Sequence, residues 1–343
     1  MTPTTRPHRL AVAGCGAAAF GLHLPLLASS DAFEVVTVAD RDTGRARTAA
    51  QRFAIPRVAT KTRDLLDGAD MLVILTGVHE DLIETALDAG THVFTEKPVG
   101  LDVTRTRMTA ARAAEAGLLL EVGAMRAHDP ALHAALAAVP EPTGGWLIKA
   151  DGADEAARRS LLPPGFAPYT FADDPPQSIP DHLEDHQVTA LQILLWQGYH
   201  LLTSLVLGAP GATPAACTLD AAGQSIHAYL YGPHGEPYTL VIGATPPGRF
   251  LEQIHFADAS DAATVDFARP YEPPGTTRVT TSSEQQDGFG DPFAAMWQAT
   301  AARLSAQHPA DLPTSADLAV RVEDLALALA AICRPGSFSR KEH

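Results

Sequence analysis

A glycine-rich turn after the first apolar run constrains the fold of this chain more than any other feature. The apolar run 10–13 leads into Gly14-Cys15-Gly16, residues 14–19 fit the pattern G-x-G-x-x-A, and a helix-like stretch follows. In such a unit, the first glycine permits a tight turn, the second lets the backbone approach a diphosphate, and the third small residue lets helix and strand pack closely. The turn therefore predicts a dinucleotide-binding unit; the alternative is a tight turn without a ligand.

Strand-like and helix-like segments alternate over the first third of the chain. The runs 33–39, 71–75, 92–95 and 118–122 are rich in apolar residues, and helical segments separate them. Strands that alternate with helices of about ten residues are typical of βαβ units with a parallel sheet. We therefore expect a Rossmann dinucleotide-binding domain over residues 1–125.

The pattern changes after residue 125. One long helix is expected from about residue 185 to 207, ending at Gly208, and helices at 292–307 and 315–333 close the chain. Short strand-like runs separated by turn residues predict a mostly antiparallel sheet; they lie at 216–221, 225–231, 238–244, 250–257, 264–268 and 276–281. The predicted fold class is α/β, with the Rossmann domain followed by an α+β domain with a large open sheet over 126–335 and a tail over 336–343.

Charge and cysteine content exclude several classes of function. The chain has 25 Lys and Arg against 40 Asp and Glu, a net charge of −15. Such a surface repels phosphate backbones and anionic lipids, so we expect neither a nucleic-acid nor a membrane partner. The three cysteines, Cys15, Cys217 and Cys333, are far apart in sequence and form no disulfide framework or CxxC zinc pair. With no transmembrane run or secretory leader, a reducing cytoplasm is expected.

An aspartate closes the second strand-like run. Asp40 follows Gly14 at about the spacing of a carboxylate that binds the ribose of a dinucleotide. Such an acid favours NAD, whereas Arg41 and Arg45 can instead hold the 2′-phosphate of NADP. NAD and NADP both remain open, and the alternative role of Asp40 is to cap the next helix.

The tripeptide Glu96-Lys97-Pro98 follows the run 92–95, at the strand end where ligands bind in open α/β sheets. The Lys97 ammonium can hydrogen-bond a hydroxyl or carbonyl oxygen, and in a desolvated site with a lowered pKa it can exchange a proton with that oxygen. Glu96 is expected to hold the lysine, and the bond before Pro98 can be cis.

These segments together resemble the Gfo/Idh/MocA oxidoreductases. The resemblance covers roughly residues 8–130 and rests on GCGAAAFGLHLP (14–25), VADRD (38–42), Leu75-Thr76-Gly77 and AGTHVFTEKP (89–98). It implies hydride transfer with NAD or NADP, usually on a sugar or cyclitol, and a homodimer or homotetramer formed through the open sheet. It also implies that Lys97 is catalytic and that the cofactor contacts Gly14, Cys15, Gly16, Ala17, Ala18, Asp40, Arg41, Arg45, Leu75, Thr76, Gly77, Glu96 and Lys97.

The family's helix motif Asp-x-Gly-x-His is only half present. Gly198-Tyr199-His200 fits its second half, but Trp196 stands where the family has aspartate. Without that acid, His200 should be a weaker acid near neutral pH unless another carboxylate replaces it. Alternatively, the indole shapes an apolar pocket for a different substrate, or His200 is only a structural helix residue.

The predicted function is that of an NAD(P)-dependent oxidoreductase in which Lys97 and His200 handle the proton. The alternatives are an imine or specialised-metabolite reductase, or a catalytically silent NAD(P)-binding sensor. Arg126 is expected either to contact the substrate or to form a surface salt bridge. His182 and His186 have a spacing that can bind zinc, but no third ligand is evident, so no metal is expected. The substrate-binding residues expected are Lys97, Arg126, His182, Trp196, Tyr199 and His200.

Overall fold

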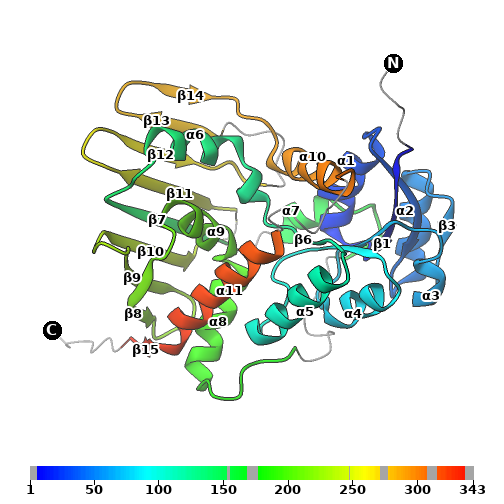
Figure 1. Cartoon of the computed structure of the whole chain (residues 1–343), viewed down its shortest axis with the longest axis horizontal. Helices are drawn as coiled ribbons and strands as arrows, with labels where there is room; N and C mark the ends of the chain where they lie inside the picture. The colour runs from blue at the N-terminus through cyan, green and yellow to red at the C-terminus, as the bar shows by residue number, and fades with distance from the viewer. Residues whose placement is uncertain are drawn as a thin grey trace.

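The computed structural model describes residues 6–152, 155–167, 177–246, 248–270, 277–306 and 315–336. These residues form two sheets joined by helices (Figure 1). Residues 161–180 contain many prolines, from which the sequence predicts a long loop of the kind that often shapes a binding site. This segment lies partly outside the described residues.

The first sheet is six-stranded and wholly parallel, with the order β3-β2-β1-β4-β5-β6. This is the doubly wound order of a Rossmann fold, in which the strand order reverses between β1 and β4 and a ligand binds beyond their carboxyl ends. Its strands are β1 (His8–Ala13), β2 (Phe33–Ala39), β3 (Arg57–Val58), β4 (Met71–Ile74), β5 (His92–Thr95) and β6 (Leu120–Val122). Its helical segments are η1 (Ala19–His23), α1 (Leu24–Ala28), α2 (Thr43–Arg52), α3 (Thr62–Leu65), α4 (Glu80–Asp88) and α5 (Val103–Glu115).

The second sheet has nine strands in the order β14-β13-β12-β11-β7-β10-β9-β8-β15. The pairs β7–β10 and β8–β15 are parallel and the other pairs are antiparallel, so the mostly antiparallel sheet expected from the sequence is confirmed. The strands are β7 (Gly144–Asp151), β8 (Thr213–Leu219), β9 (Ile226–Tyr231), β10 (Pro237–Ala244), β11 (Phe250–Ala257), β12 (Ala262–Asp266), β13 (Arg278–Thr281), β14 (Gln285–Asp287) and β15 (Cys333–Pro335).

Helices cover one face of this second sheet (Figure 1). They are α6 (Pro130–Ala138), which follows the short helix η2 (Met125–His128), together with α8 (Asp185–Trp196), α9 (Tyr199–Gly208) and α11 (Ser315–Ala331). Their apolar side chains and those of the inward-facing strand positions form one large core. Strand β9 alternates buried and exposed residues, as expected when a sheet is covered on one face only.

The expectation of a single helix over 185–207 is wrong, because this segment forms two helices, α8 and α9, which meet at an angle of 75°. Gly198 lies at the break, where an added Cβ would be 2.3 Å from Ile242 Cδ1 and 2.8 Å from the Leu194 carbonyl oxygen. The close approach to the sheet therefore requires glycine.

Within the described residues, no single helix is long and apolar enough to cross a membrane. The bent pair of α8 and α9 would be long and apolar enough only if the two helices were counted as one span.

The last two long helices return to the first sheet. Phe293, Met296 and Trp297 of α10 (Pro292–Leu304) join a core with residues of β1 and β5, and Ala316 and Ala319 of α11 join the core on the other side of that sheet. Figure 1 shows α11 running between the two sheets. The boundary at residues 125 and 126 stays a proposal, since chain segments from beyond it complete the first domain. The remaining helix is α7 (Glu155–Ser160).

Candidate active site

The glycine turn lies at the carboxyl end of β1, between β2 and β4. Gly14 has φ +100°, and an added Cβ would lie 2.7 Å from the Leu75 carbonyl oxygen, so this position requires glycine. At Gly16, by contrast, an added Cβ would meet nothing within 4 Å. Open space above Gly16 fits a turn whose backbone is approached by a diphosphate.

Asp40 fastens this turn from the end of β2. Its Oδ2 accepts a hydrogen bond from the Cys15 amide at 2.6 Å, and its Oδ1 accepts one from the Asp42 amide at 2.8 Å. The role of helix cap belongs to Asp42, which accepts from Gly44 N, so the alternative role proposed for Asp40 is wrong. Burial, with the negative charge of Asp40, raises the pKa of the Cys15 thiol, which makes it an unreactive filler of the turn.

The two arginines near Asp40 have different surroundings. The Arg45 guanidinium donates to the Ala167 carbonyl oxygen at 2.7 Å and lies 3.6 Å from Asp42. It also lies over the Phe166 ring. Arg45 is therefore held by the segment 166–167, whereas Arg41 is exposed.

The second element of the site is the turn after β5, which has a cis bond between Lys97 and Pro98. Glu96 links Lys97 to the first helical segment. Its Oε1 is 3.1 Å from His23 Nε2, and its Oε2 accepts a hydrogen bond from the Lys97 amide at 3.3 Å. Burial alone would raise the pKa of Glu96, but the hydrogen bond from His23 and the nearby Lys97 ammonium hold it below its usual value. Glu96 is therefore a carboxylate that supports Lys97.

Lys97 extends from this turn toward the second domain. Its Nζ donates to the Trp196 carbonyl oxygen at 3.1 Å and lies 6.0 Å from the centre of the Tyr199 ring. Burial lowers the pKa of Lys97 to about 8, and the Lys149 ammonium adds to this effect while Glu96 opposes it. A lysine with such a pKa can donate or accept a proton near neutral pH.

His79, which directly precedes α4, joins the cofactor side of the site to the lysine turn. Its Nε2 lies 2.6 Å from the Thr76 carbonyl oxygen, and its Nδ1 lies 2.9 Å from the Pro98 carbonyl oxygen. The side chain is buried, and burial lowers its pKa. The loop containing Leu75-Thr76-Gly77 is thus fixed relative to Lys97.

His200 enters the site from the first turn of α9. It is 9% exposed, and its Nδ1 is buried without a hydrogen-bond partner among the described residues. Burial places the pKa of His200 well below its usual value, and the positive charges of Lys97 and Lys149 act in the same direction. The imidazole is therefore neutral at neutral pH.

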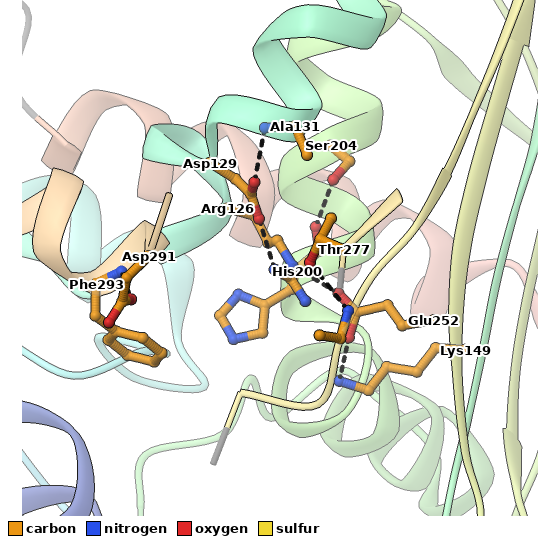
Figure 2. Close-up of polar contacts among 11 residues, drawn as sticks. Arg126, Asp129, Ala131, Lys149, His200, Ser204, Glu252, Thr277, Asp291 and Phe293 are labelled. Carbon is orange, nitrogen blue, oxygen red and sulfur yellow. Dashed lines mark hydrogen bonds and ion pairs between the residues drawn. The ribbon is translucent and has the colours of Figure 1, made fainter. Parts of the chain in front are cut away.

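A cluster of buried charges lies beside His200 (Figure 2). Glu252 of β11 accepts from Arg126 Nε at 2.8 Å and lies 3.2 Å from Lys149 Nζ of β7. Arg126 also donates to Asp129 at 2.6 Å. Burial alone would raise the pKa of Glu252, but its two cations hold it far below the usual value. The cluster combines two cations with two carboxylates and is neutral overall.

The sequence-based interpretation missed Glu252 and Lys149. The alternation of side chains along each strand indicates that both residues face inward. Lys149 lies on the same side of β7 as the buried Leu147, and Glu252 lies on the same side of β11 as the buried Ile254 and Phe256. In the family's helix motif, an aspartate at the position of Trp196 would raise the pKa of the histidine. In this chain Glu252 has that effect, because its negative charge raises the pKa of His200. One role expected for Arg126 was a surface salt bridge. This expectation is wrong, because the side chain is 2% exposed and its salt bridges are buried.

Two other predicted substrate residues are placed differently from the expectation. His182 is exposed and precedes the first residue of α8, whereas Lys97 contacts the last residue of that helix. A helix of this length separates its two ends by about 18 Å. The structure therefore does not bring His182 to the site. Trp196 contributes its carbonyl oxygen to Lys97, and its residue is 39% exposed. Among the described residues, no group of three or more His, Cys, Asp or Glu side chains is arranged to hold a metal.

Comparison with known proteins supports this arrangement. The Gfo/Idh/MocA model, described as an oxidoreductase family with an NAD-binding Rossmann fold, matches residues 8–124. scyllo-Inositol 2-dehydrogenase (NAD(+)) of Bacillus subtilis is 31% identical over 127 residues, which are 36% of this chain and 37% of that protein. dTDP-3,4-didehydro-2,6-dideoxy-alpha-D-glucose 3-reductase of Actinomadura kijaniata is 35% identical over 128 residues, which are 36% of this chain and 38% of that protein. The matched stretch thus spans less than two thirds of either relative.

Solved structures resemble the whole described fold. KijD10, a 3-ketoreductase from Actinomadura kijaniata in complex with NADP, has a TM-score of 0.72 and 21% identity, covering 96% of this chain and 98% of that one. UDP-N-acetylglucosamine 3-dehydrogenase GnnA from Acidithiobacillus ferrooxidans has a TM-score of 0.69 and 19% identity, with the same coverage.

The strand order and the residues at its switch point define a Rossmann fold of the dinucleotide-binding class, followed by a second α+β domain. Residues 8–124, less than half of the chain, match the model of the Gfo/Idh/MocA oxidoreductase family. The expected fold class is confirmed. The description of the matched family as having an NAD-binding Rossmann fold agrees with the nicotinamide dinucleotide expected as cofactor.

Proposed function

We propose that this protein is an NAD(P)-dependent oxidoreductase that interconverts a hydroxyl and a carbonyl group on a sugar, cyclitol or related small molecule. The observation that carries the proposal is the position of Lys97. It lies beyond the carboxyl end of β5, at the same edge of the sheet as the glycine turn, and contacts α8 of the second domain. The bound cofactor would supply or accept the hydride at the reacting carbon. Residues 14–18, Asp40 and the loop 75–77 would hold it, and the open space at Gly16 fits its diphosphate.

Lys97 handles the proton in this proposal. In reduction, the Lys97 ammonium donates a proton to the developing alkoxide oxygen, and in oxidation the neutral amine accepts one from the hydroxyl. Its pKa of about 8 suits both directions. His200 remains a neutral imidazole, so it serves as a hydrogen-bond partner for a substrate hydroxyl rather than as an acid.

Fluorescence titration with NADH and NADPH, followed by turnover assays on sugars, cyclitols and their keto forms, tests the proposal. We expect saturable cofactor binding and hydride transfer to at least one carbonyl compound of this class. Cofactor binding without turnover across the panel would contradict the enzymatic role, and absence of binding would contradict the cofactor site itself.

Asp40 should set a preference for NAD over NADP. Its carboxylate is fixed against the glycine turn, where it favours a ribose 2′-hydroxyl and repels a 2′-phosphate, while Arg45 is already bound to the segment 166–167. We expect Asp40→Ala to shift the ratio of kcat/KM for the two cofactors toward NADP by about tenfold or more, a change of about 1.4 kcal/mol. Steady-state kinetics with both cofactors measures this ratio.

Asp42→Ala is the matched control. This variant removes an acid two residues away that caps α2, so it should cost about 1 kcal/mol of stability without changing the cofactor ratio. An unchanged ratio in Asp40→Ala would refute the role of that carboxylate at the ribose.

We also propose that the protein is a homodimer or homotetramer that associates through the uncovered face of the second sheet. On this face, Trp146 of β7 stacks on His255 of β11, and Tyr229 and Tyr231 of β9 are about half exposed. Large exposed aromatic side chains on a wide sheet are typical of an interface.

The double substitution Tyr229→Glu/Tyr231→Glu should convert the oligomer to smaller species, because it introduces negative charges into an apolar contact. Light scattering coupled to size-exclusion chromatography measures the mass. Met108→Glu, an equally drastic change at an exposed residue of α5, should leave the mass unchanged. A wild-type protein that runs as a monomer at all concentrations would refute the interface.

A further inference from the structure

Two cysteines that are far apart in sequence meet at one edge of the second sheet. Cys217 of β8 and Cys333 of β15 are directly paired in the parallel register of these strands, and each is 3% exposed. Neighbouring strands lie about 4.8 Å apart, within the range of Cα separations of about 4.4–6.8 Å that disulfides span. Strand β15 has three residues and lies at the edge of the sheet, so it can shift to bring the sulfurs together.

The two thiols differ in character. The two thiols lie close enough to influence each other's ionisation, and the backbone amides of Leu219 and Arg334 also face the Cys333 sulfur. The neighbouring thiol and these amides lower the pKa of Cys333, while the contact between the thiols and burial raise the pKa of Cys217. Two buried thiols paired directly across neighbouring strands, one with a lowered pKa, have the arrangement of an attacking and a resolving cysteine. Cys15, in the glycine turn, has neither feature.

We propose that Cys217 and Cys333 form a reversible disulfide when the protein meets a peroxide. The Cys333 thiolate attacks one peroxide oxygen, which breaks the O–O bond and gives a sulfenic acid and one water once the leaving hydroxide is protonated. The Cys217 sulfur then attacks the sulfenic sulfur, and the second oxygen leaves as water. In total, two thiols and one hydrogen peroxide give one disulfide and two waters, with two electrons passing from sulfur to oxygen.

The disulfide would fasten the end of the described chain to the sheet. His186 Nε2 lies 3.0 Å from the Cys333 carbonyl oxygen, and Gln187 donates to the Ala331 carbonyl oxygen at 2.7 Å, so β15 is also tied to the first turn of α8. The pair lies at the opposite end of α8 from the contact between Lys97 and Trp196. The bond should therefore stabilise the fold and leave basal turnover unchanged.

The test treats the folded, full-length protein with hydrogen peroxide, blocks the remaining thiols after unfolding, and maps the peptides without reduction. We expect a Cys217–Cys333 linked peptide with Cys15 still alkylated, and an increase in Tm of about 5 °C that dithiothreitol reverses. Cys15→Ser should still form the linked peptide. Cys217→Ser should leave Cys333 as a sulfenic acid that dimedone traps.

Three results would overturn the proposal. The first is absence of the linked peptide in wild type and in Cys15→Ser while both proteins remain folded. The second is oxidation of Cys333 to sulfinic acid in wild type without a disulfide. The third is linkage of Cys15 as often as Cys217, which would show that the disulfide forms in unfolded chains.

Discussion

Replacing Lys97 with alanine should lower kcat by about three orders of magnitude while cofactor affinity changes little. The substitution removes the group that we assign to proton transfer, whereas the glycine turn, Asp40 and the loop at Thr76 are held by other contacts. Steady-state turnover and NADH titration measure the two quantities separately. Lys97→Arg should also be inactive, because a guanidinium is too weak an acid to transfer a proton near neutral pH.

The pH profile of the wild-type enzyme should reflect the lowered pKa of Lys97. Reduction needs the ammonium, so its kcat/KM should fall as the pH rises through about 8. Oxidation needs the neutral amine, so its kcat/KM should rise through the same range.

Lys61→Ala is the matched control for Lys97, since Lys61 is an exposed lysine of the same domain, just before α3. It should have wild-type turnover and an unchanged profile. If Lys97→Ala kept its kcat, the lysine would have no part in the proton transfer and the proposed mechanism would be wrong.

The second large effect is expected at Glu252. Glu252→Gln keeps the shape of the side chain but leaves Arg126 and Lys149 buried without this counter-charge, which should cost about 3–5 kcal/mol in the free energy of unfolding. Because the folded-state pKa of Glu252 is depressed, its contribution is fully present above the unfolded-state pKa of about 4.3 and is lost as the pH falls below it. The stability difference from wild type should therefore shrink on acidification.

Denaturant unfolding at several pH values measures this difference. Arg126 keeps its contact with Asp129 in this variant, whereas Lys149 loses its carboxylate. Removing Lys149 as well, in Glu252→Gln/Lys149→Met, should therefore restore part of the lost stability, because the partners are coupled. Glu284→Gln, at an exposed position in the turn between β13 and β14 of the same sheet, should change stability by less than about 0.5 kcal/mol. A loss at Glu252 no larger than at Glu284 would contradict the role of the cluster.

Activity gives a second readout of Glu252. Its negative charge raises the pKa of Lys97, so its removal should lower that pKa further and move the midpoint of the pH profile to the acid side. A purely structural role would reduce the amount of folded enzyme without moving this midpoint.

The sequence alone determined the fold of the first domain and predicted its candidate site residues. A glycine turn, an acid at the end of the second strand and a lysine at the end of the fifth are local patterns, and parallel strands bring their carboxyl ends to one edge of the sheet. That is why Gly14, Asp40 and Lys97 were predicted together from spacing, and why residues 8–124 match one family.

Only the tertiary structure decided what surrounds Lys97. The bend at Gly198 turns α9 toward the site and leaves His182 at the far end of α8, and it depends on packing against Ile242 of a later strand. Glu252, Lys149 and Arg126 come from three separate segments, and Cys217 and Cys333 come from two distant strands. These contacts depend on strand pairing over long sequence separations, which no local spacing specifies, whereas the glycine turn has a residue pattern that can be recognised within one short segment.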